Sequence, residues 1–326
     1  MLRLSDIRGH DGIVQRLQAA AVSSTAAQAY LFYGPEGVGK FAAAKAFARA
    51  LNCRGNDSAR SEGMDRRAPS GLDCGVCSSC SRIDKGSHPD IHIIDEGYTG
   101  EIKIDDVRLL QQEIALRPYE ARFKVFIIND AHNLNPVAGN ALLKTLEETP
   151  GKSIIILVTD KPRMLLATIV SRCRRENFRP LGREQFAGEL SSMGFDSAAG
   201  HYLAHFCEGR LGPATRLKGS DVLGEKNRII DRFLSGRLEA GESKREDLRR
   251  ELVVMAAWFR DVYITKLGID SAINADRKRE LEQSASRYGF DDVERILGAI
   301  SSSFLYLEQN VNIKLLLANL QSTLHG

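Results

Sequence analysis

Long hydrophobic runs are absent from this 326-residue chain, and none approaches the roughly 20 apolar residues that a membrane-spanning helix needs. The first residues, MLRLSDIRGHDG, also lack the apolar core of a secretory signal peptide. These absences predict a cytoplasmic protein with no membrane partner. With 43% hydrophobic and 27% charged residues, the composition is that of an ordinary globular protein, and the length accommodates two or three domains.

The chain also lacks a large excess of positive or negative charge. The formal net charge is +3, whereas a chain that binds nucleic acid by itself usually carries a clearly basic domain. The net charge therefore does not indicate a strong general attraction to DNA. We expect any contact with DNA to be shared with partner proteins or confined to a local patch, such as the basic run at residues 172–175.

Cysteine is rare: the chain has six, and three of them, Cys74, Cys77 and Cys80, are spaced three residues apart. In a reducing cytoplasm such a cluster favours metal binding over disulfide formation. Cys53, at the end of a predicted helix at 40–51, supplies a fourth thiolate, and four thiolates form a closed tetrahedral zinc site with a structural role. The alternatives are an iron–sulfur cluster or free buried thiols.

The N-terminal part alternates short apolar runs with helical patterns. Its first apolar run, residues 29–33 (AYLFY), is followed by a glycine-rich turn at 34–39 and the alanine-rich helix. The further predicted strands are 90–94, 125–128 and 153–158, and the further predicted helices are 104–115 and 136–148. Strands that alternate with helices indicate a parallel sheet covered on both faces, so we assign the fold class α/β.

After about residue 180 the strand pattern ends and helical spacing takes over. The predicted helices there are 225–239, 276–288, 291–309 and 311–323, and apolar residues at helical spacing also mark 252–263. We therefore predict an α/β domain at 1–180 with an inserted cysteine module at about 53–80, a small helical domain at 181–223 and an all-helical domain at 224–326.

Residues 34–40 (GPEGVGK) fit the phosphate-loop pattern G-x-x-x-x-G-K. Gly34, Gly37 and Gly39 let backbone N–H groups turn toward phosphate oxygens. The N-terminus of the following helix adds partial positive charge, and Lys40 reaches the terminal phosphates. The predicted strand before the loop and the helix after it supply the context that this motif needs. The alternative is a plain tight turn between a strand and a helix.

The groups that would hold magnesium beside such a loop are altered. The residue after the lysine is normally Ser or Thr, whose hydroxyl binds the ion, but here it is Phe41. A second ligand normally comes from an aspartate at the end of another strand, followed by a glutamate that activates water. Asn129 and Asp130 stand at those two positions. The alternative interpretation is that both residues cap the turn after the strand.

Several segments together resemble the AAA+ subunits of the bacterial DNA polymerase III clamp loader. They are residues 7–10 (IRGH), 29–32 (AYLF), 140–148 (NALLKTLEE), 171–173 (SRC) and 310–312 (NVN). The resemblance covers nearly the whole chain, and the motifs occur in the family's order. It implies an AAA+ phosphate-loop domain, a small helical lid domain and an all-helical collar domain through which subunits assemble.

The resemblance also implies a role in replication, in a ring of subunits that places the sliding clamp on primed DNA. The partners would be gamma or tau subunits and a delta subunit, with clamp and DNA contacted through the complex. Gamma and tau hydrolyse ATP in that family, whereas members of the delta-prime group often have a degraded nucleotide site. Phe41, Asn129 and Asp130 fit the delta-prime group, and Gly212 stands near the family's second sensor arginine, with Arg216 out of phase.

Three further site residues follow from the resemblance. Arg172 would be an arginine finger that reaches the ATP of a neighbouring subunit, since a guanidinium spreads permanent charge over phosphate oxygens. Without the resemblance, an ordinary surface arginine is the favoured interpretation. Thr159 would be the first sensor, with a strand-end cap as the alternative, and His88 is the substitute for Cys53 because the family's cysteine module is shorter.

Three functions remain open from the sequence. The first is a non-catalytic, delta-prime-like subunit that donates Arg172 and either binds ATP or ADP without hydrolysis or binds no nucleotide. The second is a gamma-like ATPase, favoured by Lys40 and the three glycines. The third is a zinc-stabilised DNA-binding protein, favoured by the cysteine cluster and the basic run at 172–175.

Overall fold

The computed structural model describes residues 2–23, 26–54, 73–95, 100–148, 151–236, 245–309 and 311–325. Part of the predicted cysteine module (residues 55–72), the last residues of the helix predicted at 225–239, and residue 310 of the NVN motif lie outside these ranges. The chain divides into two compact units. One comprises Met1–Gln185 with Gly209–Pro213, and the other comprises Phe186–Glu208 with Ala214–Gly326.

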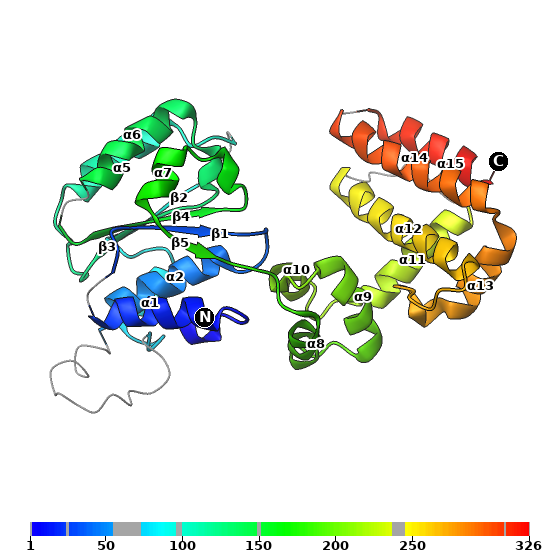
Figure 1. Cartoon of the computed structure of the whole chain (residues 1–326), viewed down its shortest axis with the longest axis horizontal. Coiled ribbons are helices and arrows are strands. Elements are labelled where there is room, and N and C mark those ends of the chain that lie inside the picture. Colours follow the sequence, from blue (N-terminus) through cyan, green and yellow to red (C-terminus); the bar gives the residue numbers. More distant parts are fainter. Residues whose placement is uncertain are drawn as a thin grey trace. The chain divides into compact units, whose positions relative to one another are not determined.

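A five-stranded parallel sheet forms the centre of the first unit (Figure 1). The strands are β1 (Ala29–Tyr33), β2 (Ile91–Ile94), β3 (Lys124–Ile128), β4 (Ser153–Thr159) and β5 (Arg174–Asn177), in the spatial order β2-β3-β4-β1-β5. β3 and β4 are buried along their whole length, as expected of near-continuous apolar runs in a parallel sheet. The predicted α/β class and parallel sheet are confirmed.

Helices cover both faces of this sheet. α1 (Asp11–Ser23) and α2 (Lys40–Asn52) lie on one face, and α5 (Ile104–Ile114), α6 (Pro136–Glu147) and α7 (Ala167–Arg172) lie on the other (Figure 1). Successive side chains of β1 point to opposite faces of the sheet. Tyr30 and Phe32 pack with α1 and α2, whereas Leu31 packs with α5 and α6. α4 (Ser78–Asp84) packs against α2. Short 3-10 helices span Leu4–Asp6, Ala131–Asn133 and Pro162–Met164.

The edge strand β5 was not predicted, because its sequence, Arg-Arg-Glu-Asn, is polar. It joins the sheet through one inward-facing carboxylate. Glu176 is 1% exposed and accepts hydrogen bonds from Arg16 on α1, whose Nε lies 3.2 Å from Oε2. Arg174 adds a second ionic contact at 3.4 Å. A buried carboxylate paired with two partly exposed arginines therefore takes the place of the apolar side chains that identified the other strands.

The described residues of the second unit contain helices and no strand. The helices that lie wholly in it are α9 (Ser197–Cys207), α11 (Val222–Leu234), α12 (Arg245–Lys266), a 3-10 turn (Ala275–Arg277), α13 (Lys278–Arg287), α14 (Phe290–Glu308) and α15 (Ile313–His325). Helices α8 (Arg183–Ser192) and α10 (Leu211–Arg216) cross from one unit to the other. One core built around Trp258, Phe259 and Phe233 joins α11 to α15. The predicted division into three domains stays a prediction.

Replacing Arg16 with alanine removes the hydrogen-bond donor that faces the buried carboxylate of Glu176. We expect the free energy of unfolding, measured by urea titration, to fall by about 1–3 kcal/mol, because the buried carboxylate loses its main donor and keeps only the contact with Arg174 at 3.4 Å. Arg108→Ala is the control, because Arg108 pairs with Asp105 at the surface and its loss should cost less than about 1 kcal/mol. Equal losses in the two variants would contradict this account of β5.

Candidate nucleotide and metal sites

The phosphate loop lies where the motif predicts, between the end of β1 at Tyr33 and the start of α2 at Lys40. Its three glycines have positive φ values: +144° at Gly34, +80° at Gly37 and +97° at Gly39. L-residues with a side chain rarely adopt such values, so the loop shape depends on glycine. At Gly34 the space is also closed, since a Cβ atom would lie 2.0 Å from the carbonyl oxygen of Phe178.

Hydrogen bonds engage the carbonyl groups of the loop. Lys40 Nζ donates to the carbonyl oxygens of Gly34 and Pro35, at 2.7 Å each. The carbonyl of Gly37 accepts from the backbone N–H of Gly212 at 2.8 Å. By contrast, the backbone N–H groups of residues 36–39 donate to no described residue. This arrangement leaves a row of donors for an anion such as a phosphate.

Lys40 itself is buried, with 7% of the residue exposed. Burial lowers its pKa from the usual value of a lysine, and the nearby carboxylates of Asp160, Asp130 and Glu36 oppose the shift. The ammonium group therefore rests against loop carbonyls and acidic side chains. Binding a phosphate at the loop would require it to turn from the carbonyls of Gly34 and Pro35 toward the anion.

Phe41, the residue in place of the magnesium-binding Ser or Thr, packs against the apolar core beneath α1 and α2. Its ring is a structural part of the unit and offers no metal ligand.

Asn129 and Asp130 follow β3 and interact with each other. Asn129 Nδ2 donates to Asp130 Oδ2 at 2.8 Å, and Asp130 begins the 3-10 turn Ala131–Asn133 with φ +46°. Asp130 occupies the N-cap position of that turn and its carbonyl oxygen accepts from the N–H of Asn133 at 2.8 Å, but its side chain makes no capping hydrogen bond. The amide of Asn129 is thus hydrogen-bonded to its neighbour, and the residue offers no carboxylate to a metal ion.

The sequence interpretation assigned no role to His132 and Asp160, although they complete a polar group at this strand edge. His132 Nδ1 lies 3.1 Å from the hydroxyl of Thr159 and 3.3 Å from Oδ1 of Asp160. Asp130, His132 and Asp160 each place a ligand-type atom within 4.8 Å of the others. The Thr159 hydroxyl also accepts from the N–H of Lys161 at 3.0 Å, as the strand-end alternative predicts. The sequence signal that could have identified Asp160 as part of this polar group is its position directly after Thr159.

Gly212, near the position where the resemblance predicts a second sensor arginine, touches the phosphate loop directly. A Cβ atom built there would lie 2.8 Å from the carbonyl oxygen of Gly37 and 3.0 Å from its Cα. The backbone of this segment thus fills the space next to the loop, and no side chain fits at position 212. Arg216 belongs to the other compact unit.

Arg172 ends α7 and is 35% exposed at its side chain. Its Nη1 donates to the carbonyl oxygen of Thr168 at 2.9 Å, and its Nη2 donates to Oε1 of Glu147. Of the adjacent basic residues, Arg174 pairs with the buried Glu176. The basic run at 172–175 is therefore partly neutralised within the chain.

The four predicted cysteines come together, and their sulfur atoms all lie within 4.8 Å of one another. Backbone N–H groups point at three of the sulfurs: Cys74 N lies 3.3 Å from Cys53 Sγ, Cys77 N lies 3.3 Å from Cys74 Sγ, and Cys80 N lies 3.5 Å from Cys77 Sγ. In a tetrahedron with metal–sulfur bonds of about 2.3 Å, sulfurs lie about 3.8 Å apart. The four thiols are therefore close enough together to hold one metal ion.

The thiols of this cluster differ in their acidity. Burial by itself raises the pKa of Cys77, but hydrogen bonds from the backbone N–H groups of Cys80 and Arg54 outweigh it and lower that pKa to about 6. Burial raises the pKa of Cys80 above the usual thiol value. Because metals bind the thiolate, Cys77 offers the ionised ligand at neutral pH.

His88, the substitute fourth ligand, lies outside this group. It is buried, its Nδ1 accepts from the N–H of Asp90 at 3.1 Å, and its Nε2 lies 3.2 Å from the hydroxyl of Ser79. Both ring nitrogens are therefore engaged. The geometry favours Cys53 over His88 as the fourth ligand.

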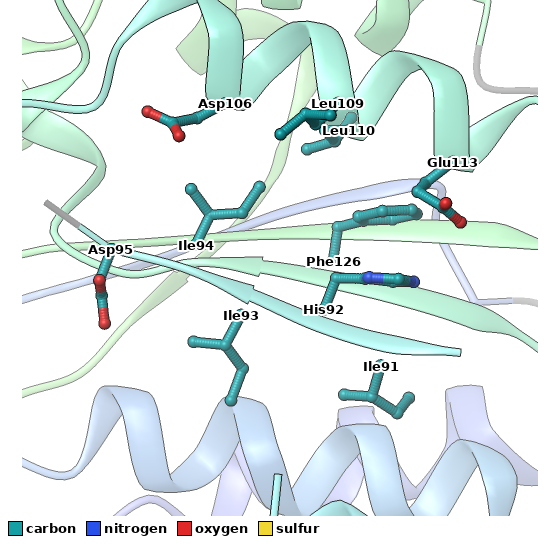
Figure 2. A pocket seen from close by; sticks show the side chains of 10 residues that line it. All are labelled: Ile91, His92, Ile93, Ile94, Asp95, Asp106, Leu109, Leu110, Glu113 and Phe126. Carbon is teal, nitrogen blue, oxygen red and sulfur yellow. The ribbon is translucent and has the colours of Figure 1, made fainter. Parts of the chain in front are cut away.

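A cavity of about 470 Å³ lies at the edge of the sheet, away from the phosphate loop. Figure 2 shows Leu109 and Leu110 of α5 above it and the edge strand β2 below, where His92 stacks on Phe126 with ring centres 4.8 Å apart. Its lining includes none of the predicted site residues, and we assign it no ligand.

A parallel sheet of this order, with a phosphate loop after β1 and polar residues after β3 and β4, has the fold of the AAA+ class. None of the described helices is long and apolar enough to cross a membrane.

Comparison with known families gives two matches. Residues 9–182 match the family described as DNA polymerase III, delta subunit, and residues 240–323 match that subunit's C-terminal domain. The chain belongs to the family of DNA polymerase III delta-type clamp-loader subunits.

Individual relatives fall into two groups. The DNA polymerase III subunit tau of Bacillus subtilis is 36% identical over 191 residues, which cover 59% of this chain and 31% of tau. The chain spans about a third of the length of such tau relatives. The subunit delta' of B. subtilis is 26% identical over 310 residues, covering 90% of this chain and 89% of that one. A gamma subunit-related structure from Thermotoga maritima covers 94% of this chain and 98% of its own, with 18% identity and a TM-score of 0.46.

Adding a methyl group at Gly212 should strain the phosphate loop. We expect Gly212→Ala to lower the free energy of unfolding by about 1–3 kcal/mol, because the new Cβ meets backbone that cannot move aside without cost. Gly182→Ala is the matched control, since a Cβ there meets nothing within 4 Å, and it should change stability by less than about 0.5 kcal/mol. An unchanged urea midpoint in Gly212→Ala would show that the segment does not rest on the loop.

Removing one thiol should abolish metal binding by the cysteine cluster. We expect Cys53→Ser to lose most of its zinc after purification in zinc-containing medium, measured by elemental analysis, because a closed site needs all its ligands. His88→Ala should keep its zinc, since neither ring nitrogen faces the sulfurs. The opposite result, with zinc lost from His88→Ala and kept in Cys53→Ser, would reverse the assignment of the fourth ligand.

Proposed function

We propose that this chain is a delta-prime-type subunit that does not hydrolyse ATP itself. It assembles with gamma or tau and delta subunits into the clamp loader, which loads the sliding clamp onto primed DNA. One combined observation carries the proposal: two magnesium ligands are missing, with Phe41 in the core and Asn129 bonded to its neighbour, while Arg172 stands partly exposed at the end of α7. The match with delta' along both chains agrees with it.

In this proposal Arg172 acts on the nucleotide of the neighbouring subunit. Its guanidinium would stabilise the negative charge that develops on the transferred phosphoryl group, a contribution that arginine fingers make in related ATPases. The chain's own loop would serve as a static cradle, in which the N–H groups of residues 36–39 and Lys40 hold ATP or ADP without turnover.

We also propose that Cys53, Cys74, Cys77 and Cys80 hold a structural zinc ion. Zinc suits a set of four sulfurs because it favours tetrahedral geometry and thiolate ligands. With all positions taken by cysteine, such an ion has no open position for a substrate. Its effect would be to tie the end of α2 at Cys53 to α4, which includes Cys80.

A gamma-like ATPase is the second candidate. It is favoured by the complete phosphate loop and by the 36% identity to tau over 191 residues. In that case the chain would need magnesium ligands other than the two that are missing, and Asp130 with Asp160 would have to supply them.

The finger assignment is tested in the reconstituted complex. Arg172→Ala should assemble normally, while hydrolysis at the neighbouring site should fall by on the order of 10³-fold, as when an arginine finger is removed. Arg175→Ala is the control, since it removes a neighbouring exposed charge from β5. Turnover by the Arg172 variant equal to that of the control would remove the finger assignment.

A further inference from the structure

The contact between Arg172 and Glu147 joins the ends of two helices. Glu147 is the last residue of α6 and Arg172 is the last residue of α7. The carboxylate accepts from Nη2, and the carbonyl of Thr168 accepts from Nη1 at 2.9 Å. The guanidinium is thus held on two sides by its own chain, with 35% of the arginine side chain and 48% of the glutamate side chain exposed.

The two helices pack against each other over the sheet. Gly139 of α6 faces α7, and a Cβ atom there would lie 3.4 Å from Leu166 and 3.8 Å from Ile169. Leu142 of α6 and Ile169 of α7 belong to the same buried core over the sheet. Glu147 thus extends from a helix that packs on α7, and its carboxylate gives the flexible arginine side chain a partner on that neighbouring helix.

Helix or fold stability does not account for a glutamate at this position. The C-terminal end of a helix carries partial negative charge and favours Lys, Arg or His over a carboxylate. Ion pairs that are this exposed contribute little to folding stability. A carboxylate at the end of α6 is thus unfavourable for its own helix. What it does provide is a hydrogen-bond acceptor that orients Arg172.

We propose that Glu147 is a positioning residue for the arginine finger, a role that rests on the proposed function of Arg172. The carboxylate and the Thr168 carbonyl each take one N–H of the guanidinium, and both nitrogens still carry a second N–H that can meet a phosphate oxygen of the neighbouring ATP. Without Glu147, the finger samples many rotamers and is correctly placed for a smaller fraction of the time.

The test compares Glu147→Gln with Glu148→Gln in the fully reconstituted complex. Both changes remove one negative charge from the same end of α6, but only the first weakens the acceptor of Arg172, because the amide oxygen of glutamine is neutral and binds a guanidinium less strongly than a carboxylate does. We expect Glu147→Gln to lower kcat for ATP by about 3- to 10-fold with KM unchanged, because misplacing a catalytic group slows chemistry without weakening nucleotide binding. Glu148→Gln should keep the original kcat, and Glu147→Asp should recover part of the loss.

Assembly and thermal unfolding of each variant separate positioning from folding. A kcat in Glu147→Gln equal to that of Glu148→Gln, or higher than that of the unmodified complex, would overturn the proposal. So would a loss of kcat that is matched by a loss of assembled complex. If both Glu147→Gln and Arg172→Ala leave kcat unchanged, the finger role fails together with the positioning role. If Arg172→Ala lowers kcat and Glu147→Gln does not, only the role of Glu147 is wrong.

Discussion

The parallel arrangement of the strands is the constraint on which the site depends. Because β1, β3 and β4 run in the same direction, the segments that follow them meet at one edge of the sheet. Lys40 of the loop after β1 thereby comes under the influence of Asp130 after β3 and Asp160 after β4. The same edge would place magnesium ligands beside a nucleotide, so substitutions there alter the chemistry without disturbing the fold.

At this edge, the groups that would bind a nucleotide are different from the groups that would support its hydrolysis. The loop keeps its glycine backbone, its row of N–H donors and its lysine, and the N–H of Gly212 braces it through the carbonyl of Gly37. In contrast, Phe41 is committed to the core and Asn129 to its neighbouring aspartate. Anion binding needs only the first group, whereas catalysis by magnesium needs the second. The proposed division of labour between this chain and a neighbour follows from that separation.

The predictable parts of the fold were those with local signals. Apolar runs identified β1 to β4, and the glycine pattern located the phosphate loop between β1 and α2. The strand β5 could not be found in this way, because its one buried side chain, Glu176, pairs with Arg16, which is 160 residues away in the sequence. The contact of Gly212 with Gly37 and the position of Cys53 beside the other cysteines also depend on residues that are distant in the sequence. No local sequence pattern indicates which distant backbone or side chain will be their neighbour.

The most direct measurement of the central claim is an ATP titration of the purified chain alone, with and without magnesium, followed by an assay of turnover. The account predicts that any binding is nearly independent of magnesium, because the retained contacts are the loop N–H groups and Lys40, and that no hydrolysis is detected. Magnesium-dependent turnover by the isolated chain that disappears in Lys40→Ala would contradict it and would favour a gamma-like ATPase.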